Sequence, residues 1–148
     1  MVSAIQSYCD ETDQAVPTDK GEIVRCVLES LALEYREVAD QIDRLTGKQH
    51  AVIHIIGGGS QNQLLNQLTA HATEKTVCAG PVEATAIGNI LVQAIAMGEI
   101  GSLDEGRSIV RNSFPINTYQ PQDSNAWDEA YQRYQKFKKA DRKYEDTQ

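Results

Sequence analysis

The sequence predicts an α/β fold that is rich in helices and built around a short parallel β-α-β unit. The first observation is AVIHII (51–56), a short β-branched run that is followed by three glycines and then by a helical pattern. The second is TVCA (76–79), another strand-like run that follows this helix. A strand, a helix and a second strand in succession favour parallel pairing with a right-handed crossover.

Two helices should precede this unit. A short helix is expected over residues 2–12. Asp19 and Glu22 then have the spacing of a capping box, so a long helix should begin there, and Gly47 should end it. The apolar residues of the long helix recur in alternating steps of four and three, which places them on one face. They are Val24, Leu28, Leu31, Tyr35, Val38, Ile42 and Leu45.

The β-α-β unit itself is expected to be well buried. Its first strand has the composition of a strand that is covered on both faces, and His54 within it should be a core histidine. Ser60 should cap the helix that follows the glycines. The inward face of that helix should carry Leu64, Leu65, Leu68 and Ala72.

The next helix, residues 83–97, is apolar on almost every side, so we expect it to be deeply buried. Parallel strands normally belong to larger sheets, and two convincing strands do not complete such a sheet. We therefore expect the chain to be part of something larger or to self-associate, because an uncovered apolar face favours association.

Three further elements are expected toward the end of the chain. Ser102 and Glu105 have capping-box spacing for a short helix that should run through Val110. FPINTY (114–119) contains a proline and fits an edge strand. A last helix should start near Ser124, and its charged tail, KKADRKYEDTQ (138–148), should fray. The inward residues of this helix should be Trp127, Ala130, Tyr131, Tyr134 and Phe137.

Composition limits the class of protein. The chain has 148 residues and a formal charge of −7, which argues against nucleic acid as a partner. No apolar run is long enough to span a membrane, and no secretory signal pattern is visible. We expect a soluble, cytoplasmic protein that binds neither nucleic acid nor membrane.

The cysteines and histidines give no sign of a metal site. Cys9, Cys26 and Cys78 lack metal-ligand spacing, and reduced buried thiols are favoured, although a bridge between Cys9 and Cys26 stays open. No Ser–His–Asp arrangement and no pair of carboxylates stands out. We therefore assign no catalytic residue and no metal-binding residue.

The three glycines at 57–59 mark the candidate ligand site. They lie at the carboxyl end of a predicted parallel strand and directly before a helix, which is where ligands of open α/β sheets collect. Glycine lets the backbone approach a ligand closely, and the helix start offers free N–H groups. A P-loop is excluded, because no lysine follows in GxxxxGK[ST] spacing.

Three interpretations of this turn remain open. Gly57 and Gly59 fit a dinucleotide fingerprint, but Asn62 stands at its third glycine position. In a base-and-ribose site, Gly57, Gly58 and Gly59 form a flat backbone wall, and Asn62 in the first helical turn presents an amide that can pair with adenine. The third interpretation is a tight turn that holds no ligand.

Three segments resemble the carboxyl-terminal domain of the FGGY carbohydrate kinases. They are IVRCVLESLALEYREV (23–38), IHIIGGGSQNQLLNQLTA (53–70) and VCAGPVEATAIGNILVQAIAMGEI (77–100). The resemblance implies an incomplete actin-like, ribonuclease-H-like ATPase lobe. Residues 1–148 would form the carboxyl-terminal portion of the second lobe, on its adenosine-binding side, with the amino-terminal lobe and the start of the second lobe absent.

The resemblance also implies a function. Such kinases transfer the γ-phosphate of ATP, with Mg²⁺, to a sugar hydroxyl, and the segments are most similar to kinases of L-rhamnulose. Gly58 and Asn62 would lie against adenosine, with Gly57 and Gly59 shaping the wall. The catalytic base and the sugar contacts would belong to the missing part, so the chain alone should be inactive. A stand-alone adenine-nucleotide module and, less favoured, a dinucleotide-dependent oxidoreductase fragment are the alternatives.

Overall fold

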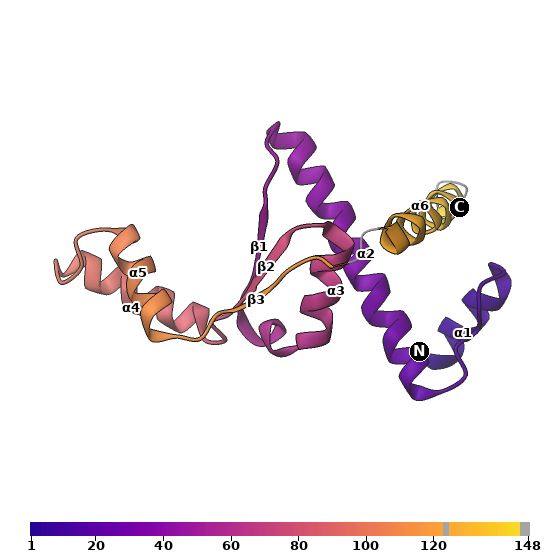
Figure 1. Ribbon diagram of the computed structural model, residues 1–148, viewed down its shortest axis with the longest axis horizontal. Helices are drawn as coiled ribbons and strands as arrows, with labels where there is room; N and C mark the ends of the chain where they lie inside the picture. Colours follow the sequence, from indigo (N-terminus) through magenta and orange to yellow (C-terminus); the bar gives the residue numbers. More distant parts are fainter. Residues whose placement is uncertain (123–124, 146–148) are drawn as a thin grey trace.

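The structure is a computed structural model, and it describes the backbone of residues 1–122 and 125–145 and the side chains up to residue 139. The elements along the chain are α1 (Val2–Glu11), α2 (Lys20–Thr46), β1 (Val52–Ile55), α3 (Gln63–Thr73), β2 (Thr76–Ala79), α4 (Ala84–Ala96), α5 (Leu103–Ser113), β3 (Asn117–Tyr119) and α6 (Asn125–Glu145) (Figure 1). A 3₁₀ turn over Gly57–Gln61, here called the glycine turn, lies between β1 and α3.

The β-α-β unit that the sequence predicts is confirmed. The strand order in the sheet is β1-β2-β3. β1 and β2 are parallel, and their register pairs Ile55 with Ala79 at the carboxyl ends. β3 pairs antiparallel with β2 and forms the edge strand that FPINTY predicted. The fold is therefore helix-rich α/β with a small mixed sheet.

The long helix α2 begins as its capping box predicts. The Glu22 N–H donates to Asp19 Oδ1 at 2.9 Å, and the Asp19 N–H donates to Glu22 Oε2 at 3.4 Å. The helix ends at Gly47, which adopts a left-handed conformation with φ of 65°. Both ends of α2 are thus set by local chemistry that is readable in the sequence.

The core lies where α2 crosses α3. Ala32 of α2 packs with Leu68 and Ala72 of α3, and Leu28 and Trp127 extend this cluster. Small side chains at the crossing let the two helices approach closely. The core therefore lies beside the predicted apolar face of α2, rather than along it.

The predicted inward faces are only partly correct. Within the face predicted for α2, Leu28 is half-buried. The other six members are at least 39% exposed, namely Val24, Leu31, Tyr35, Val38, Ile42 and Leu45. On α3, Leu68 and Ala72 are buried and Leu65 is half-buried, but Leu64 is 46% exposed. The periodicity identifies an apolar face correctly, but it does not say what covers that face.

The prediction of a first strand buried on both faces is wrong for this chain. Val52 and His54 are exposed, whereas Ile53 and Ile55 are half-buried. Side chains alternate between the two faces of a strand, so one face of β1 is covered and the other is open. The prediction that His54 is a core histidine is wrong for the same reason.

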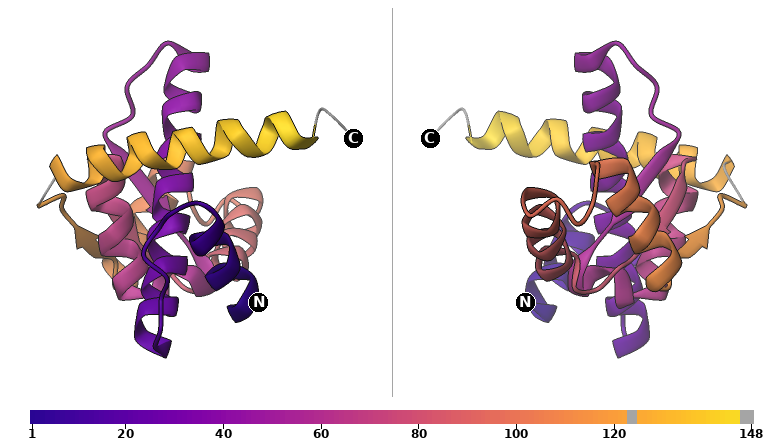
Figure 2. Two further views of the ribbon diagram at one scale, coloured as in Figure 1. Left: turned by 90° about the vertical axis from the view of Figure 1, so that its right-hand side faces the viewer. Right: turned by 90° about the vertical axis from the view of Figure 1, so that its left-hand side faces the viewer.

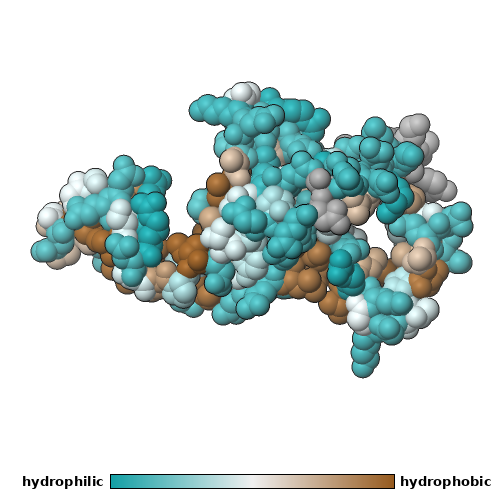
Figure 3. Space-filling model, in the orientation of Figure 1, coloured by the Kyte–Doolittle hydropathy of each residue, from teal (hydrophilic) through white to brown (hydrophobic). Residues whose placement is uncertain are grey.

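Deep burial of the helix at 83–97 is also not observed. α4 has no buried residue, and Ile90, Val92 and Met97 are 66%, 65% and 76% exposed. Figure 1 shows α4 and α5 standing to one side of the molecule, and Figure 3 shows apolar surface on this pair. The apolar composition of α4 therefore faces solvent here, as expected of a helix that lacks part of its cover.

The short helix α5 is capped as expected but is longer than expected. Ser102 Oγ accepts a hydrogen bond from the Glu105 N–H at 3.2 Å. The Glu105 carboxylate accepts from the Gly101 N–H at 2.8 Å, one residue before the position that a capping box requires. α5 then continues to Ser113, beyond the expected end at Val110.

The last helix, α6, crosses α2 (Figure 2). Of its predicted inward residues, Tyr131 is buried and Trp127, Ala130, Tyr134 and Phe137 are half-buried. The guanidinium of Arg36 lies 4.4 Å from the centre of the Tyr131 ring, and Lys138 Nζ lies 2.7 Å from a Glu34 carboxylate oxygen. The expected start at Ser124 and the last three residues of the tail lie outside the described residues, and the described part of the tail is helical through Glu145.

The two thiols that could form a bridge are both free. Cys9 of α1 is buried and Cys26 of α2 is half-buried, and Cys78 of β2 is also a free thiol. Burial raises the pKa of Cys26, and the neighbouring Cys9 raises it further. The thiols of Cys9 and Cys26 therefore lie near each other in the reduced state.

In the part of the chain that the structure describes, no helix is long and apolar enough to cross a membrane.

An ion cluster joins the end of α2 to the start of both strands. Lys75 Nζ lies 2.7 Å from Asp43 Oδ2 and donates to the His50 carbonyl at 2.7 Å. His50 Nδ1 lies 2.6 Å from Asp43 Oδ1. Hydrogen bonds from Lys75 and then from His50 hold the pKa of Asp43 well below its usual range.

We expect the Asp43→Asn variant to be less stable than wild type at neutral pH. A carboxylate with a depressed pKa in the folded state stabilises the fold above its unfolded pKa, about 3.9, and loses this effect as pH falls through the folded pKa. The difference in unfolding free energy between wild type and variant should therefore shrink below about pH 4. Urea unfolding at several pH values measures it. Asp104→Asn, which alters an exposed pair with Arg107, is the control. A difference that is constant with pH would contradict this role for Asp43.

Candidate functional site

Two strand-to-helix turns lie side by side at one edge of the sheet. β1 and β2 are parallel, so their carboxyl ends point to the same edge, at the lower end of β1 in Figure 1. The Gly57 N–H donates to the Pro81 carbonyl at 3.2 Å, and the Gly80 N–H donates to the Ile55 carbonyl at 2.8 Å. α3 and α4 both begin beyond these turns. Their amino termini bring two partial positive charges to the edge where α/β sheets hold ligands.

Hydrogen bonds within the glycine turn fix its start and its end. Ser60 Oγ donates to the Gly57 carbonyl at 2.7 Å, and the Asn62 N–H donates to the Gly59 carbonyl at 3.2 Å. The prediction that Ser60 caps the next helix is wrong. The 3₁₀ turn delays the start of α3, and Asn62 is its N-cap instead.

Gly58 presents bare main chain to the outside. A Cβ atom built on Gly58 would meet no heavy atom within 4 Å, whereas one on Gly59 would lie 3.8 Å from Ile55 Cγ2. Gly57 has φ of 75°, a conformation that favours glycine. Gly58 and Gly59 are exposed and Gly57 is half-buried. The three glycines thus form an open strip of backbone.

Asn62 follows this strip, and the oxygen of its side-chain amide already accepts a hydrogen bond. Asn62 Oδ1 accepts from the Leu65 N–H at 3.1 Å. The side chain is exposed, and among the residues that the structure describes its Nδ2 has no hydrogen-bond partner. The expected position in the first helical turn is thus corrected to the N-cap. Asn62 can donate through Nδ2, and Oδ1 keeps a second lone pair.

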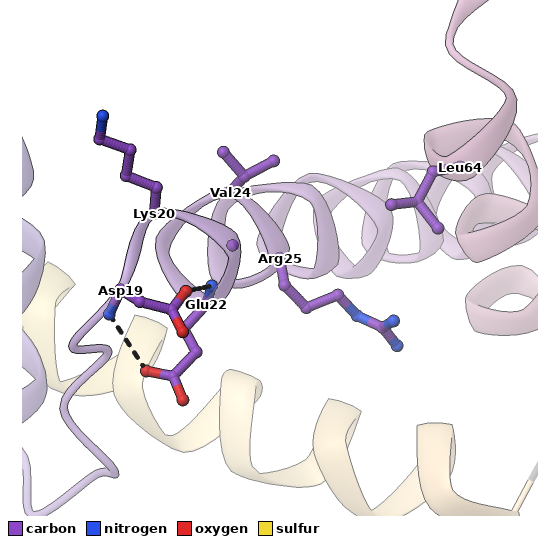
Figure 4. A pocket seen from close by; sticks show the side chains of 7 residues that line it. Asp19, Lys20, Glu22, Val24, Arg25 and Leu64 are labelled. Carbon is purple, nitrogen blue, oxygen red and sulfur yellow. Dashed lines mark hydrogen bonds between the residues drawn. The ribbon is translucent and has the colours of Figure 1, made fainter.

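Two hollows of the surface lie away from the glycine turn. One, of about 790 Å³, lies at the start of α2 and is shown in Figure 4; it is lined by Asp19, Lys20, Gly21, Glu22, Val24, Arg25 and Leu64. The dashed lines in Figure 4 are the capping box, so its carboxylates already serve the helix end. A second, of about 290 Å³, lies between α2 and α6. Neither includes the glycine turn, which is an open wall rather than an enclosed pocket.

One polar residue beneath the turn was not singled out from the sequence. Asn66 of α3 is 0% exposed, and its Nδ2 donates to the Ser60 carbonyl at 2.9 Å. The signal that could have revealed it is an amide on the inward side of a helix, between Leu65 and Leu68, seven residues after the last glycine. A buried amide in such a place needs a partner, and the Ser60 carbonyl of the turn provides one.

The comparisons with known proteins identify the family. Residues 2–97 match the carboxyl-terminal domain of the FGGY family of carbohydrate kinases. The chain belongs to this FGGY family. The resemblance that the three sequence segments indicated is thereby confirmed.

The chain is similar in sequence to three bacterial rhamnulokinases. It is 50% identical to the rhamnulokinase of Bacteroides thetaiotaomicron over 131 residues, which cover 88% of this chain and 27% of the relative. It is 46% identical to the rhamnulokinase of Bacillus subtilis, with 83% and 25% covered, and 44% identical to that of Enterococcus faecalis, with 94% and 28% covered. The chain thus spans about a quarter of the length of the curated relatives it matches.

A solved structure has the same fold. The FGGY chain superposes on xylulose kinase from Rhodospirillum rubrum with a TM-score of 0.69 and 18% identity, covering 88% of this chain and 26% of that protein. The small mixed sheet and its helices therefore share the fold of the matching part of that protein.

Proposed function

We propose that the glycine turn and Asn62 hold the adenosine part of ATP in a carbohydrate kinase. The observation that supports this most is the open backbone at Gly58 beside the unengaged Nδ2 of Asn62, at the carboxyl ends of two parallel strands. A flat base can lie against main chain that carries no side chain, and an amide can pair with its polar edge. Gly57 and Gly59 shape the wall.

For the whole kinase, we propose transfer of the γ-phosphate of ATP to a hydroxyl of L-rhamnulose. Membership in the FGGY family supports a sugar kinase, and the names of relatives at 44–50% identity support this sugar. In this proposal residues 1–148 are the carboxyl-terminal portion of the second lobe. The rest of the kinase supplies the catalytic base and the sugar contacts, and the enzyme works in the cytoplasm, where ATP is available.

Mg²⁺ would accompany ATP, but the residues of this edge do not fit a magnesium site. Magnesium is held by several oxygen ligands in an octahedral arrangement. Glu83, which precedes α4, is the one carboxylate among residues 54–73 and 76–96. Within the described ranges, no group of three or more His, Cys, Asp or Glu side chains is placed to hold a metal ion. We assign this chain no metal-binding residue.

The geometry favours adenosine over a dinucleotide. A dinucleotide site places the pyrophosphate against the free N–H groups of the first helix, close to the third glycine of the fingerprint. Asn62 occupies that glycine's position, and its own Oδ1 already engages the Leu65 N–H. The donors that a pyrophosphate needs are therefore partly used.

Calorimetric titration of the 148-residue chain with ADP, adenosine and NAD tests the site. We expect ADP and adenosine to bind with dissociation constants within about tenfold of each other, because the base and ribose make the contacts. NAD should bind no more tightly than ADP. Absence of ADP binding, or a clear preference for NAD, would overturn the proposal.

The chain by itself should not phosphorylate L-rhamnulose. Phosphoryl transfer needs a group that accepts the hydroxyl proton and groups that position the sugar, and we assign neither to these residues. A coupled assay of ADP release, with the purified chain, ATP, Mg²⁺ and L-rhamnulose, measures this. Turnover above the rate without protein would refute the assignment of the catalytic step to other parts of the kinase.

A further inference from the structure

We propose that Asn66 is a positioning residue, which holds the glycine turn in the shape that receives adenosine. The inference rests on the proposed function, because it concerns the same site. The side chain of Asn66 donates its hydrogen bond to Ser60, the residue that follows the three glycines, and so acts on the open strip of backbone through Ser60.

Asn66 bonds to both the turn and the N-cap. Its Nδ2 donates to the Ser60 carbonyl at 2.9 Å, and its backbone N–H donates to the Asn62 carbonyl at 3.0 Å. The residue is 0% exposed, so these bonds are shielded from water. A side chain fixed in the interior of α3 therefore sets the position of the last residues of the turn.

From Ser60 the contacts continue to the second turn. Ser60 Oγ donates to the Gly57 carbonyl at 2.7 Å, and the Gly57 N–H donates to the Pro81 carbonyl at 3.2 Å. Asn66, Ser60 and Gly57 thus form one hydrogen-bonded series from α3 to the segment that leads into α4. Gly58, the residue proposed to meet the base, lies inside this series.

The glycines make such support necessary. Glycine has the widest choice of backbone conformations, so three in succession do not define a shape by themselves. Disorder in a binding loop must be removed on binding, and this weakens affinity, whereas a preorganised loop avoids that loss. The Asn66 amide supplies order that the sequence GGG cannot.

The oxygen of the Asn66 amide indicates that this residue does more than stabilise the fold. Asn66 Oδ1 is buried and has no hydrogen-bond partner among the described residues. A buried acceptor without a partner is destabilising, and an apolar side chain of similar size would avoid that penalty. The contribution of Asn66 is therefore made through the donor that meets Ser60.

The test compares Asn66→Leu with Thr69→Val in the 148-residue chain. Thr69 is also 0% exposed on α3, but its hydroxyl donates to the Leu65 carbonyl within the helix rather than to a carbonyl of the turn. In Asn66→Leu, we expect the backbone amides of Gly57 and Asn62 to exchange hydrogen roughly tenfold faster, because the Ser60 carbonyl loses its partner. The ADP dissociation constant should rise by a similar factor.

Two controls accompany this variant. The exchange rates of the backbone amides of Ala70 and Ala72 report on the α3 core and should change little. Thr69→Val should leave the turn and ADP affinity unchanged.

Ser60→Ala gives a second, smaller break in the same series. It removes the hydroxyl bond to Gly57, keeps the Ser60 carbonyl, and should raise exchange at Gly57 and weaken ADP binding. Wild-type exchange at the turn and wild-type ADP affinity in both Asn66→Leu and Ser60→Ala would overturn the inference. If wild type binds no ADP, the proposed function fails, and the exchange rates still decide whether Asn66 orders the turn.

Discussion

The Gly58→Leu variant is expected to lose ADP binding while it keeps its fold. No heavy atom lies within 4 Å of a Cβ at this position, and Gly58, unlike Gly57, does not have a positive φ. A side chain at this position therefore begins in open space, so folding should tolerate it. The same side chain would project into the space that we assign to adenosine. We expect the ADP dissociation constant to rise at least about thirtyfold, a loss of roughly 2 kcal/mol.

Gly88→Leu is the matched control for that experiment. Gly88 lies within α4, and a Cβ there also meets no heavy atom within 4 Å. The same side chain is thus added at another glycine whose Cβ position is free of contacts, outside the proposed site. Calorimetry with ADP and circular dichroism should show wild-type affinity and fold for Gly88→Leu, and a wild-type fold without affinity for Gly58→Leu. Wild-type ADP binding by Gly58→Leu would show that the base does not lie on this backbone.

The Gly80→Ala variant is expected to show the largest loss of stability. Gly80 has φ of 124°, and a Cβ there would lie 2.7 Å from the Pro115 carbonyl oxygen. The oxygen belongs to the backbone of Pro115, and the Cβ is rigidly attached to the backbone of residue 80, so neither atom can yield without displacing β3 from β2. Strained backbone costs about 1–3 kcal/mol and forced packing a similar amount. We expect unfolding free energy to fall by about 2–4 kcal/mol.

Gly98→Ala separates the two causes of that loss. Gly98 also has a positive φ, 79°, but a Cβ there meets nothing within 4 Å. Gly98→Ala should therefore lose only the unfolding free energy that is due to the strained backbone conformation, about 1 kcal/mol. Urea unfolding of both variants measures the difference. Equal losses for Gly80→Ala and Gly98→Ala would mean that the approach of Pro115 to Gly80 has no energetic weight.

The elements that local chemistry defines could be predicted from the sequence. The Asp19–Glu22 capping box and the left-handed Gly47 set the ends of α2, and both are visible as residue types at fixed spacing. The short strands around α3 follow from their β-branched residues and flanking turns. The glycines at 57–59 could likewise be assigned to a turn, because they directly follow a predicted strand and precede a helical pattern.

The details of the site depend on structure that the sequence does not display. A 3₁₀ turn consumes Gly57–Gln61, so the cap moves from Ser60 to Asn62. Helix boundaries shift by such amounts easily, because 3₁₀ turns are frequent at the ends of α-helices. Asn66 was missed since its importance comes from a carbonyl six residues earlier, which only the folded turn brings beneath it.

Burial was the least predictable property, and α4 illustrates why. Its sequence is apolar on almost every side, yet none of its residues is buried. β1 carries the composition of a covered strand but is open on the face of Val52 and His54. The hydrophobic pattern of a segment indicates which of its faces favours burial. Whether that face is buried depends on the tertiary or intermolecular contacts that cover it. Both observations agree with a chain that spans about a quarter of its relatives.

The most direct test of the adenosine site is a backbone amide NMR titration of the chain with ADP. The account predicts that the amide signals of Gly57, Gly58, Gly59 and Asn62 shift together and saturate at one dissociation constant. Signals at the hollow near Asp19 and Arg25 should stay in place. Saturable shifts confined to that hollow or to another surface, with the glycine signals unmoved, would contradict the claim that this bare backbone receives the nucleotide.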